Sequence, residues 1–273
     1  MEKIAFYGKG GIGKSTVAAG VSMALAMAGK RVLHVGCDPK HDSTATLVKE
    51  KKITTLIDMI FSRKVGELNR DDLIMEGKLG IDCVEAGGPE PGIGCGGRAI
   101  SRMFEVFEQI GLVDDEKYDV AIFDVLGDVV CGGFAAPLRA SIAPKVAIVV
   151  SEEMMAGYAA NNISKAVLHY LDNGACLAGL VLNIRDNKSD KKPIFRLAEA
   201  INTKILVEIP RTPKILEGEL RRACVMEYAP KTKAARNIAK LSNVLIEMQP
   251  SHCTQPLPVE LENVREIMLG KGS

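Results

Sequence analysis

Residues 8–16 combine glycine, lysine and hydroxyl side chains at the spacing of a phosphate-binding loop. The segment reads GKGGIGKST, follows the apolar run Ile4–Tyr7 and precedes a helix-like stretch, which fits the pattern G-x-x-x-x-G-K-[ST]. Glycines let backbone amides surround phosphate oxygens, and the N-terminus of the following helix favours negative charge. We expect Lys14 to reach the β- and γ-phosphates and Ser15 to bind Mg²⁺. The predicted nucleotide contacts are Gly8, Lys9, Gly10, Gly11, Ile12, Gly13, Lys14, Ser15 and Thr16.

Two aspartates at the ends of apolar runs are candidates for phosphoryl transfer to water. Asp38 comes after Val32–Gly36, and Asp124 comes after Val120–Phe123. Carboxylates at strand ends lie on the sheet edge where ligands bind in open α/β folds. Hydrolysis needs a metal holder and a residue that orients the attacking water; Asp124 suits the first role and Asp38 the second. The alternative is that either aspartate only caps a helix or a turn.

Two of the seven cysteines stand in a setting that suits a metal cluster. Cys95 and Cys131 are each followed by Gly-Gly and then by a helix-like stretch, where close backbone approach and a helix N-terminus stabilise a thiolate. A cubane cluster needs four thiolates, and two identical chains would supply them. We therefore infer one [4Fe–4S] cluster on the two-fold axis of a homodimer. The other cysteines are expected to be small apolar core residues, and His34, His169 and His252 show no metal spacing.

Short apolar runs alternate with longer amphipathic stretches along the chain. Many of the runs lack the period of two that a half-exposed strand shows, so they suit parallel strands covered on both faces. This alternation predicts an α/β fold with a doubly wound, mostly parallel sheet. The expected strands are Ile4–Tyr7, Val32–Gly36, Ile81–Ala86, Val120–Val125, Val146–Val150, Leu177–Asn183 and Ile205–Ile209, and the expected helices are Ser15–Ala28, Ala99–Ile110, Met154–Leu171 and Ile194–Ile201.

The composition predicts one catalytic domain over residues 1–248 and a C-terminal surface extension over residues 249–273. The chain is 47% hydrophobic, which is enough for a large core. Three prolines after residue 249 argue against another core strand. A net charge of +1 favours neither nucleic acid nor an anionic membrane as a partner. Without a leader pattern or a run of ~20 apolar residues, we expect a cytoplasmic protein.

Several longer motifs resemble the nitrogenase iron protein family. This family includes nitrogenase reductase and the nitrogenase-like ATP-dependent reductases of tetrapyrrole synthesis. The resemblance covers residues 2 to 240 and is carried by the segments Gly8–Thr16, Gly36–Thr44, Gly87–Arg98, Asp124–Pro137 and Glu153–Ser164.

The resemblance implies a deviant phosphate-loop NTPase that works as a homodimer. One [4Fe–4S] cluster would be held by Cys95 and Cys131 of both subunits, beside two MgATP sites. Low-potential electrons would come from a ferredoxin or flavodoxin and pass to a nitrogenase or nitrogenase-like catalytic component. The residues to which the resemblance gives further roles are Lys9 (reaching the other subunit's nucleotide), Asp128 (catalysis), Asn183, Pro210, Arg211 and Glu219 (adenosine), and Arg98 and Arg139 (partner docking).

The sequence leaves two questions open. His41 and Phe134–Pro137 look like the tetrapyrrole reductases, whereas Gly88–Gly92 and Glu153–Ala156 look like nitrogenase iron proteins, so the electron acceptor is not fixed. A second class of function is a deviant phosphate-loop ATPase that positions cell machinery or serves as an iron–sulfur scaffold. It would share Lys9 and Lys14 but would not need Cys95 and Cys131 in these glycine contexts.

Overall fold

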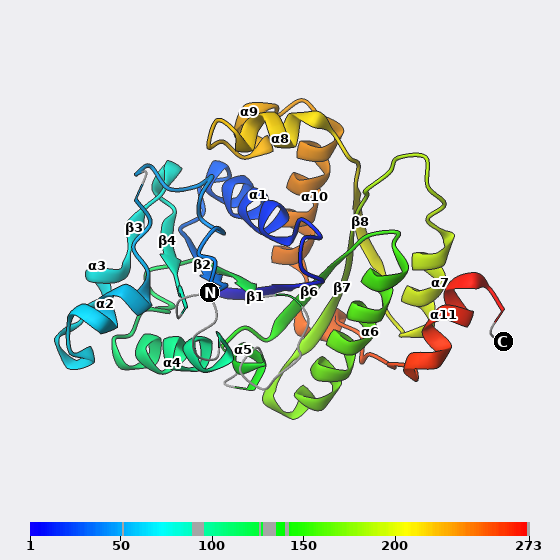
Figure 1. Ribbon diagram of the computed structural model, residues 1–273, viewed down its shortest axis with the longest axis horizontal. Coiled ribbons are helices and arrows are strands. Elements are labelled where there is room, and N and C mark those ends of the chain that lie inside the picture. Colours follow the sequence, from blue (N-terminus) through cyan, green and yellow to red (C-terminus); the bar gives the residue numbers. More distant parts are fainter. Residues whose placement is uncertain (51, 89–95, 126, 128–134, 140–141, 272–273) are drawn as a thin grey trace.

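The fold was analysed in a computed structural model (Figure 1). It describes residues 1–50, 52–88, 96–125, 127, 135–139 and 142–271. Three predicted site residues, Cys95, Asp128 and Cys131, lie outside the described residues.

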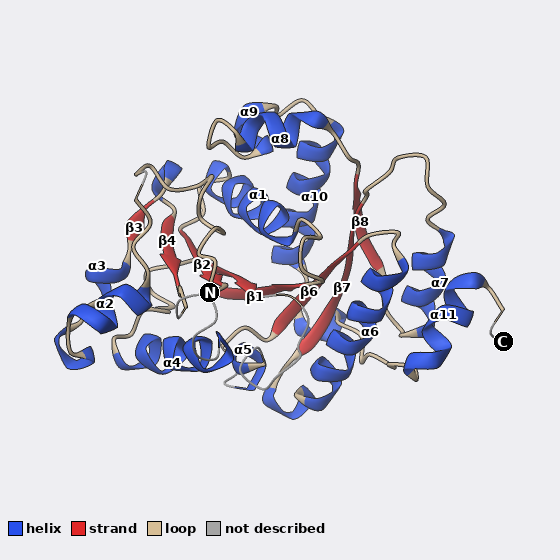
Figure 2. Cartoon of the chain, viewed as in Figure 1, coloured by secondary structure: helices blue, strands red, loops and turns tan. Residues whose placement is uncertain are grey.

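A twisted eight-stranded sheet runs through the centre of the molecule (Figure 2). Its strand order is β3-β4-β2-β5-β1-β6-β7-β8, and the pairing is parallel except for the antiparallel β3–β4 pair. Every residue of β2, β5 and β6 is buried, as expected for strands covered on both faces. The strands are β1 (Glu2–Tyr7), β2 (Val32–Cys37), β3 (Met75–Glu76), β4 (Asp82–Glu85), β5 (Val120–Val125), β6 (Lys145–Val150), β7 (Cys176–Asn183) and β8 (Ile205–Ile209).

Helices cover both faces of the sheet, which confirms the doubly wound α/β prediction. In Figure 1, α1 and α10 lie on one face, and α4, α5 and α6 lie on the other. The α-helices are α1 (Lys14–Met27), α2 (Leu56–Ser62), α3 (Arg70–Leu73), α4 (Gly96–Gln109), α5 (Ala136–Arg139), α6 (Met154–His169), α7 (Lys192–Ala200), α8 (Pro213–Glu219), α9 (Val225–Tyr228), α10 (Lys233–Glu247) and α11 (Leu261–Leu269). Four short 3-10 turns are η1 (Val65–Glu67), η2 (Lys78–Gly80), η3 (Leu171–Asn173) and η4 (Pro250–His252).

Each apolar run predicted as a strand is a strand, with ends shifted by at most a residue or two. Several helices were not predicted, and α10 is the longest of them. It begins after Thr232, whose hydroxyl accepts a hydrogen bond from the Ala235 amide, a common helix N-cap. Its buried Ile238 packs on Gly20 of α1, where an added Cβ would come within 3.0 Å of the Ile238 side chain. This contact lets α1 and α10 pack closely side by side on one face of the sheet.

The C-terminal residues pack on the helices beside β7. Helix α11 contacts α6 and α7, and its Val264 and Met268 are buried. Gly157 of α6 makes room for this contact, since an added Cβ would lie 2.6 Å from the Met268 sulfur. In the described residues, no helix combines the length and the apolar character needed to cross a membrane.

The packing of α11 gives a prediction about stability. Met268→Ala should lower the free energy of unfolding by about 2–3 kcal/mol, because it leaves a cavity between three helices. The neighbouring Leu269 is 46% exposed, so Leu269→Ala is the matched control and should change it by less than about 1 kcal/mol. Urea denaturation of both variants measures the difference. Equal losses would show that α11 does not contribute its buried face to the core.

Candidate functional site

The phosphate loop connects the end of β1 to the start of α1. Gly8 and Gly13 have φ angles of +148° and +87°, which side chains other than hydrogen rarely allow. A Cβ at Gly8 would overlap the Val149 carbonyl, and one at Gly13 would overlap the Asn183 amide. Around Gly10 and Gly11, by contrast, a Cβ would meet nothing within 4 Å. The loop is therefore fixed at both ends and open in the middle, which is the shape that a phosphate group needs.

Lys14 and Asp124 form a buried ion pair at the base of this loop. Asp124 is 0% exposed and Lys14 is 7% exposed. Asp124 also accepts a hydrogen bond from the hydroxyl of Ser43, at 2.6 Å. Burial acts to raise the pKa of Asp124, but the Lys14 charge and the hydrogen bonds to the carboxylate outweigh it and lower that pKa. Asp124 is thus a carboxylate whose charge is balanced by the lysine of the phosphate loop.

The position of Asp124 follows from the sheet. On β5 it is paired with Phe6 of β1 on one side and with Gly36 of β2 on the other. Because β1 leads into the phosphate loop and β2 into Asp38, the carboxylate lies between these two segments. Parallel strands of this order place all three at one edge of the sheet.

Residues 38–44, here named the switch segment, follow β2 and form a turn. Asp38 is 9% exposed and its carboxylate accepts a hydrogen bond from the Lys40 amide at 2.9 Å. His41 has a φ of +46° and is exposed. The structure therefore places Asp38 in the turn role that the sequence left open as an alternative. A role for it in orienting water stays a prediction.

Glu85, which sequence reasoning did not select, holds the end of the switch segment. It is 0% exposed at the end of β4, and its Oε1 accepts hydrogen bonds from the Thr44 amide at 2.7 Å and the Thr44 hydroxyl at 2.8 Å. Within the described part of the chain, its Oε2 has no partner. Burial is the main cause that raises the pKa of Glu85 to about 8, and Asp124 and Asp42 add to it against the Thr44 hydrogen bonds. The signal in the sequence was a glutamate inside the apolar run Ile81–Ala86.

Two of the four predicted adenosine contacts, Asn183 and Glu219, reach the phosphate loop and the start of α1. Asn183 donates a hydrogen bond to the Ile12 carbonyl at 2.8 Å, and Glu219 accepts one from the Thr16 hydroxyl at 2.8 Å. Pro210 and Arg211 follow β8, which pairs with β7 at Asn183. Pro210 and Arg211 therefore follow the strand beside Asn183 at this edge of the sheet, and Glu219 reaches α1 from α8.

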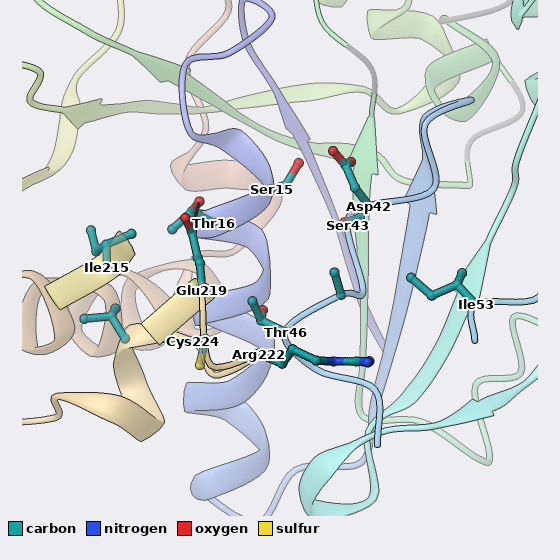
Figure 3. Close-up of a pocket in the computed structure, with 12 residues that line it drawn as sticks. Ser15, Thr16, Asp42, Ser43, Thr46, Ile53, Ile215, Glu219, Arg222 and Cys224 are labelled. Atoms are coloured by element: carbon teal, nitrogen blue, oxygen red, sulfur yellow. Dashed lines mark hydrogen bonds between the residues drawn. The ribbon is translucent and has the colours of Figure 1, made fainter. Parts of the chain in front are cut away.

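A cavity of about 520 Å³ opens beside the first turn of α1 (Figure 3). Ser15 and Thr16 line one wall, Asp42 and Ser43 line another, and Glu219 lies next to Thr16. A cavity of this size lies within the usual range of small-molecule sites. Predicted nucleotide contacts and the switch segment thus face one space.

The structure describes the flanks of the predicted cluster site. Gly96, the residue that follows Cys95 in the sequence, begins α4. Arg98 is exposed in the first turn of α4, and Arg139 ends α5; the two helices are in contact. Half-buried Lys9 lies in the phosphate loop. Among the described residues, no group of three or more histidine, cysteine or acidic side chains could hold a metal ion.

Comparisons with known proteins agree on family and fold. A family model of 4Fe-4S iron sulfur cluster binding proteins, NifH/frxC family, matches residues 2–272. The chain is 41% identical over 268 residues to the nitrogenase iron protein of Methanococcus voltae, which covers 98% of this chain and 95% of that relative. The nitrogenase iron protein of Methanospirillum hungatei JF-1 is 41% identical over 270 residues, with the same two coverages. Among solved structures, the Pyrococcus furiosus cell division ATPase MinD is similar with a TM-score of 0.71 and 25% identity, over 90% of this chain and 98% of that chain.

The buried Glu85 gives a prediction about pH. A raised pKa means that the folded chain holds a proton that the unfolded chain releases above its own pKa near 4.5. The protonation of Glu85 therefore contributes fully to the free energy of unfolding below about pH 4.5, and this contribution is lost as the pH rises through about 8. Between pH 6 and pH 9 the loss should be roughly 2–3 kcal/mol.

Glu85→Gln should remove this slope, because the amide resembles the neutral acid and can still accept from Thr44. Unfolding free energies measured at pH 6, 7, 8 and 9 test the expectation, with the exposed Glu247→Gln as control. A slope that is the same in wild type and Glu85→Gln would contradict the raised pKa.

Proposed function

The chain belongs to the NifH/frxC family of 4Fe-4S iron–sulfur cluster binding proteins, and on this premise we propose that it is the ATP-hydrolysing, electron-transferring reductase component of a nitrogenase or nitrogenase-like system. The observation that carries the proposal is the buried contact between Lys14 and Asp124. It joins the phosphate loop to the strand that leads towards Cys131, and so it can couple a nucleotide to the cluster.

The coupling follows from the charges of the site. A triphosphate on the open face of Gly10 and Gly11 offers Lys14 a more negative partner than Asp124 does. With Lys14 turned to the phosphates, Asp124 would lose its counter-charge, and Ser15 and Asp124 would be the residues that hold Mg²⁺, which would neutralise charge on the phosphates. The segment after Asp124, with Asp128 and Cys131, then has a different anchor in the two nucleotide states. A phosphate-dependent change of anchor is the usual basis of switches in this class of fold.

We assign the cluster ligands to Cys95 and Cys131 of two subunits. When bound, a [4Fe–4S] cluster supplies one electron at a time at low potential. The start of α4 at Gly96 supports the assignment, because the positive end of a helix stabilises a thiolate and the negative charge of a cluster. Four thiolates require a homodimer, in which Lys9 would reach the nucleotide of the other subunit and Asp128 would take part in hydrolysis.

The partners follow from the same reading. The exposed Arg98 and the nearby end of α5 at Arg139 would form part of the surface that docks on the catalytic component. The two relatives at 41% identity carry the name nitrogenase iron protein, which supports a nitrogenase or nitrogenase-like acceptor. A ferredoxin or flavodoxin would return the electron to the cluster.

A second candidate function is an ATPase that positions cell machinery or carries iron–sulfur clusters. The likeness to the cell division ATPase MinD at 25% identity favours it. The phosphate loop and Asp124 serve either function. Cys95 and Cys131 have no role in a positioning ATPase, and therefore the iron content of the purified protein separates the reductase from an ATPase of that kind. A cluster carrier would also contain iron, but it would not pass electrons to a catalytic component, so electron transfer to that component separates the reductase from it.

The cluster assignment predicts the effect of losing either thiolate. Cys95→Ser and Cys131→Ser should each abolish the reduced-cluster EPR signal and lower the iron content from about four per dimer to near zero. Cys224 precedes α9 and is 4% exposed, so Cys224→Ser is the matched control and should keep both. A normal EPR signal in either variant would refute the ligand assignment, and an iron-free wild type that hydrolyses ATP would favour the second candidate.

The phosphate-site assignment predicts the effect of removing the Lys14 charge. Lys14→Gln should abolish the MgATP-induced change in the EPR signal and in the chelation of cluster iron, while the cluster itself remains. Glutamine keeps a donor for Asp124, which limits the cost of leaving a buried charge unpaired. The exposed Lys30→Gln is the control. An unchanged response to MgATP in Lys14→Gln would show that the nucleotide binds elsewhere.

A further inference from the structure

A chain of hydrogen bonds runs through the core from α1 to Asp124. The Ser22 hydroxyl of α1 lies 2.8 Å from His34 Nδ1, and His34 Nε2 lies 2.9 Å from the Ser43 hydroxyl. Ser43 in turn donates to Asp124 at 2.6 Å. Ser22 and His34 are both 0% exposed and Ser43 is 2% exposed, so all three side chains are shielded from bulk solvent. Sequence reasoning gave His34 no role because it has no metal spacing.

The chemistry of the groups fixes the direction of every bond. The Asp124 carboxylate can only accept, so the single hydroxyl proton of Ser43 points at Asp124. Ser43 must then accept from His34, which requires a proton on Nε2. A neutral imidazole carries one ring proton, so Nδ1 is bare and accepts from Ser22. One tautomer of neutral His34 satisfies all four groups.

The burial of His34 keeps it neutral. Desolvation lowers the pKa of His34 to about 4, and although Asp124 opposes this effect, Lys14 adds to it. A doubly protonated ring would have to donate to Ser22 as well and would reverse the first bond of the chain. The direction of the chain is therefore stable at neutral pH.

We propose that His34 is a positioning residue that orients Ser43 and ties the switch segment to Asp124, so that a change at Asp124 reaches residues 38–44. The inference rests on the proposed function, because the change at Asp124 is the loss of Lys14 to a bound triphosphate. Ser43 lines the same cavity as Ser15, which places its hydroxyl at the boundary between the nucleotide side and the core. While the Ser43 oxygen accepts from His34, the one hydroxyl proton of Ser43 remains available for an acceptor at the cavity, which in this structure is Asp124.

Two substitutions of His34 distinguish a role in positioning Ser43 from a purely structural role, in which His34 only has its own hydrogen bonds made. The side-chain amide of His34→Gln reaches the position of Nε2 and can still donate to Ser43. His34→Asn reaches only the position of Nδ1 and can still accept from Ser22, but it leaves Ser43 without its donor. Ser22→Ala removes the far end of the chain and serves as control, since it touches neither the switch segment nor Asp124.

Hydrogen exchange of residues 38–44, measured by mass spectrometry with and without MgATP, is the readout. Without nucleotide, His34→Asn should speed exchange of this segment about five- to tenfold, the equivalent of one lost hydrogen bond. The MgATP-induced change in the segment should be lost in His34→Asn and kept in His34→Gln and Ser22→Ala. Unfolding free energies of all three variants, measured in parallel, report loss of packing separately.

The outcomes separate this inference from the proposed function. A wild-type protein that shows no MgATP binding by calorimetry would overturn the proposed function. It would also overturn the proposed link from Asp124 to the switch segment, because that link rests on nucleotide binding. If the wild type binds MgATP and His34→Asn responds as the wild type does, only the role of His34 is overturned. Equal effects of His34→Asn and Ser22→Ala on exchange at residues 38–44 would likewise reduce His34 to a structural residue.

Discussion

The buried pair of Lys14 and Asp124 is the interaction on which the rest of the site depends. Two charges inside a core are tolerated only when each has a partner and the remaining hydrogen-bonding capacity is filled. Here the sheet supplies the carboxylate from β5, α1 supplies the ammonium group, and Ser43 supplies a further donor to Asp124. The strand order brings these segments together, and the close packing of Ile238 on Gly20 holds α1 against α10.

In a buried ion pair of this kind, the lysine can also exchange its carboxylate partner for another anion. Its attraction is offset by the cost of removing both ions from water, so a competing anion of higher charge can take the lysine. The switch segment is held at two neighbouring residues, Ser43 and Thr44, by Asp124 and Glu85 respectively. Both acceptors are buried carboxyl groups. Burial dominates at Glu85 and raises its pKa, whereas at Asp124 the charged and hydrogen-bonding partners outweigh burial and lower its pKa. One anchor is charged and sensitive to the phosphate loop, and the other is largely neutral.

The sequence was sufficient to predict the fold class and the phosphate loop, because strands buried on both faces and the G-x-x-x-x-G-K-[ST] pattern are local signals. It missed α10, although the buried Ala234, Ile238, Leu241 and Leu245 recur at the three- to four-residue spacing of an amphipathic helix. Glu85 and His34 were missed for a different reason. Their importance comes from contacts with residues that are distant in sequence, Thr44 and Ser22 among them. The predicted contacts Asn183 and Glu219 do reach the phosphate loop and α1.

The close approach of β2 and β4 has a consequence for how this sequence can vary. A Cβ at Gly36 would overlap the carboxyl group of Glu85, so the two positions share a single volume. A larger residue at position 36 requires a shorter one at position 85, and each change alone meets a steric or a cavity cost. The pair should therefore behave as one unit in a library of variants, with strong non-additivity between the two sites. A variant that tolerates a side chain at position 36 should therefore be one in which position 85 no longer carries a carboxyl group.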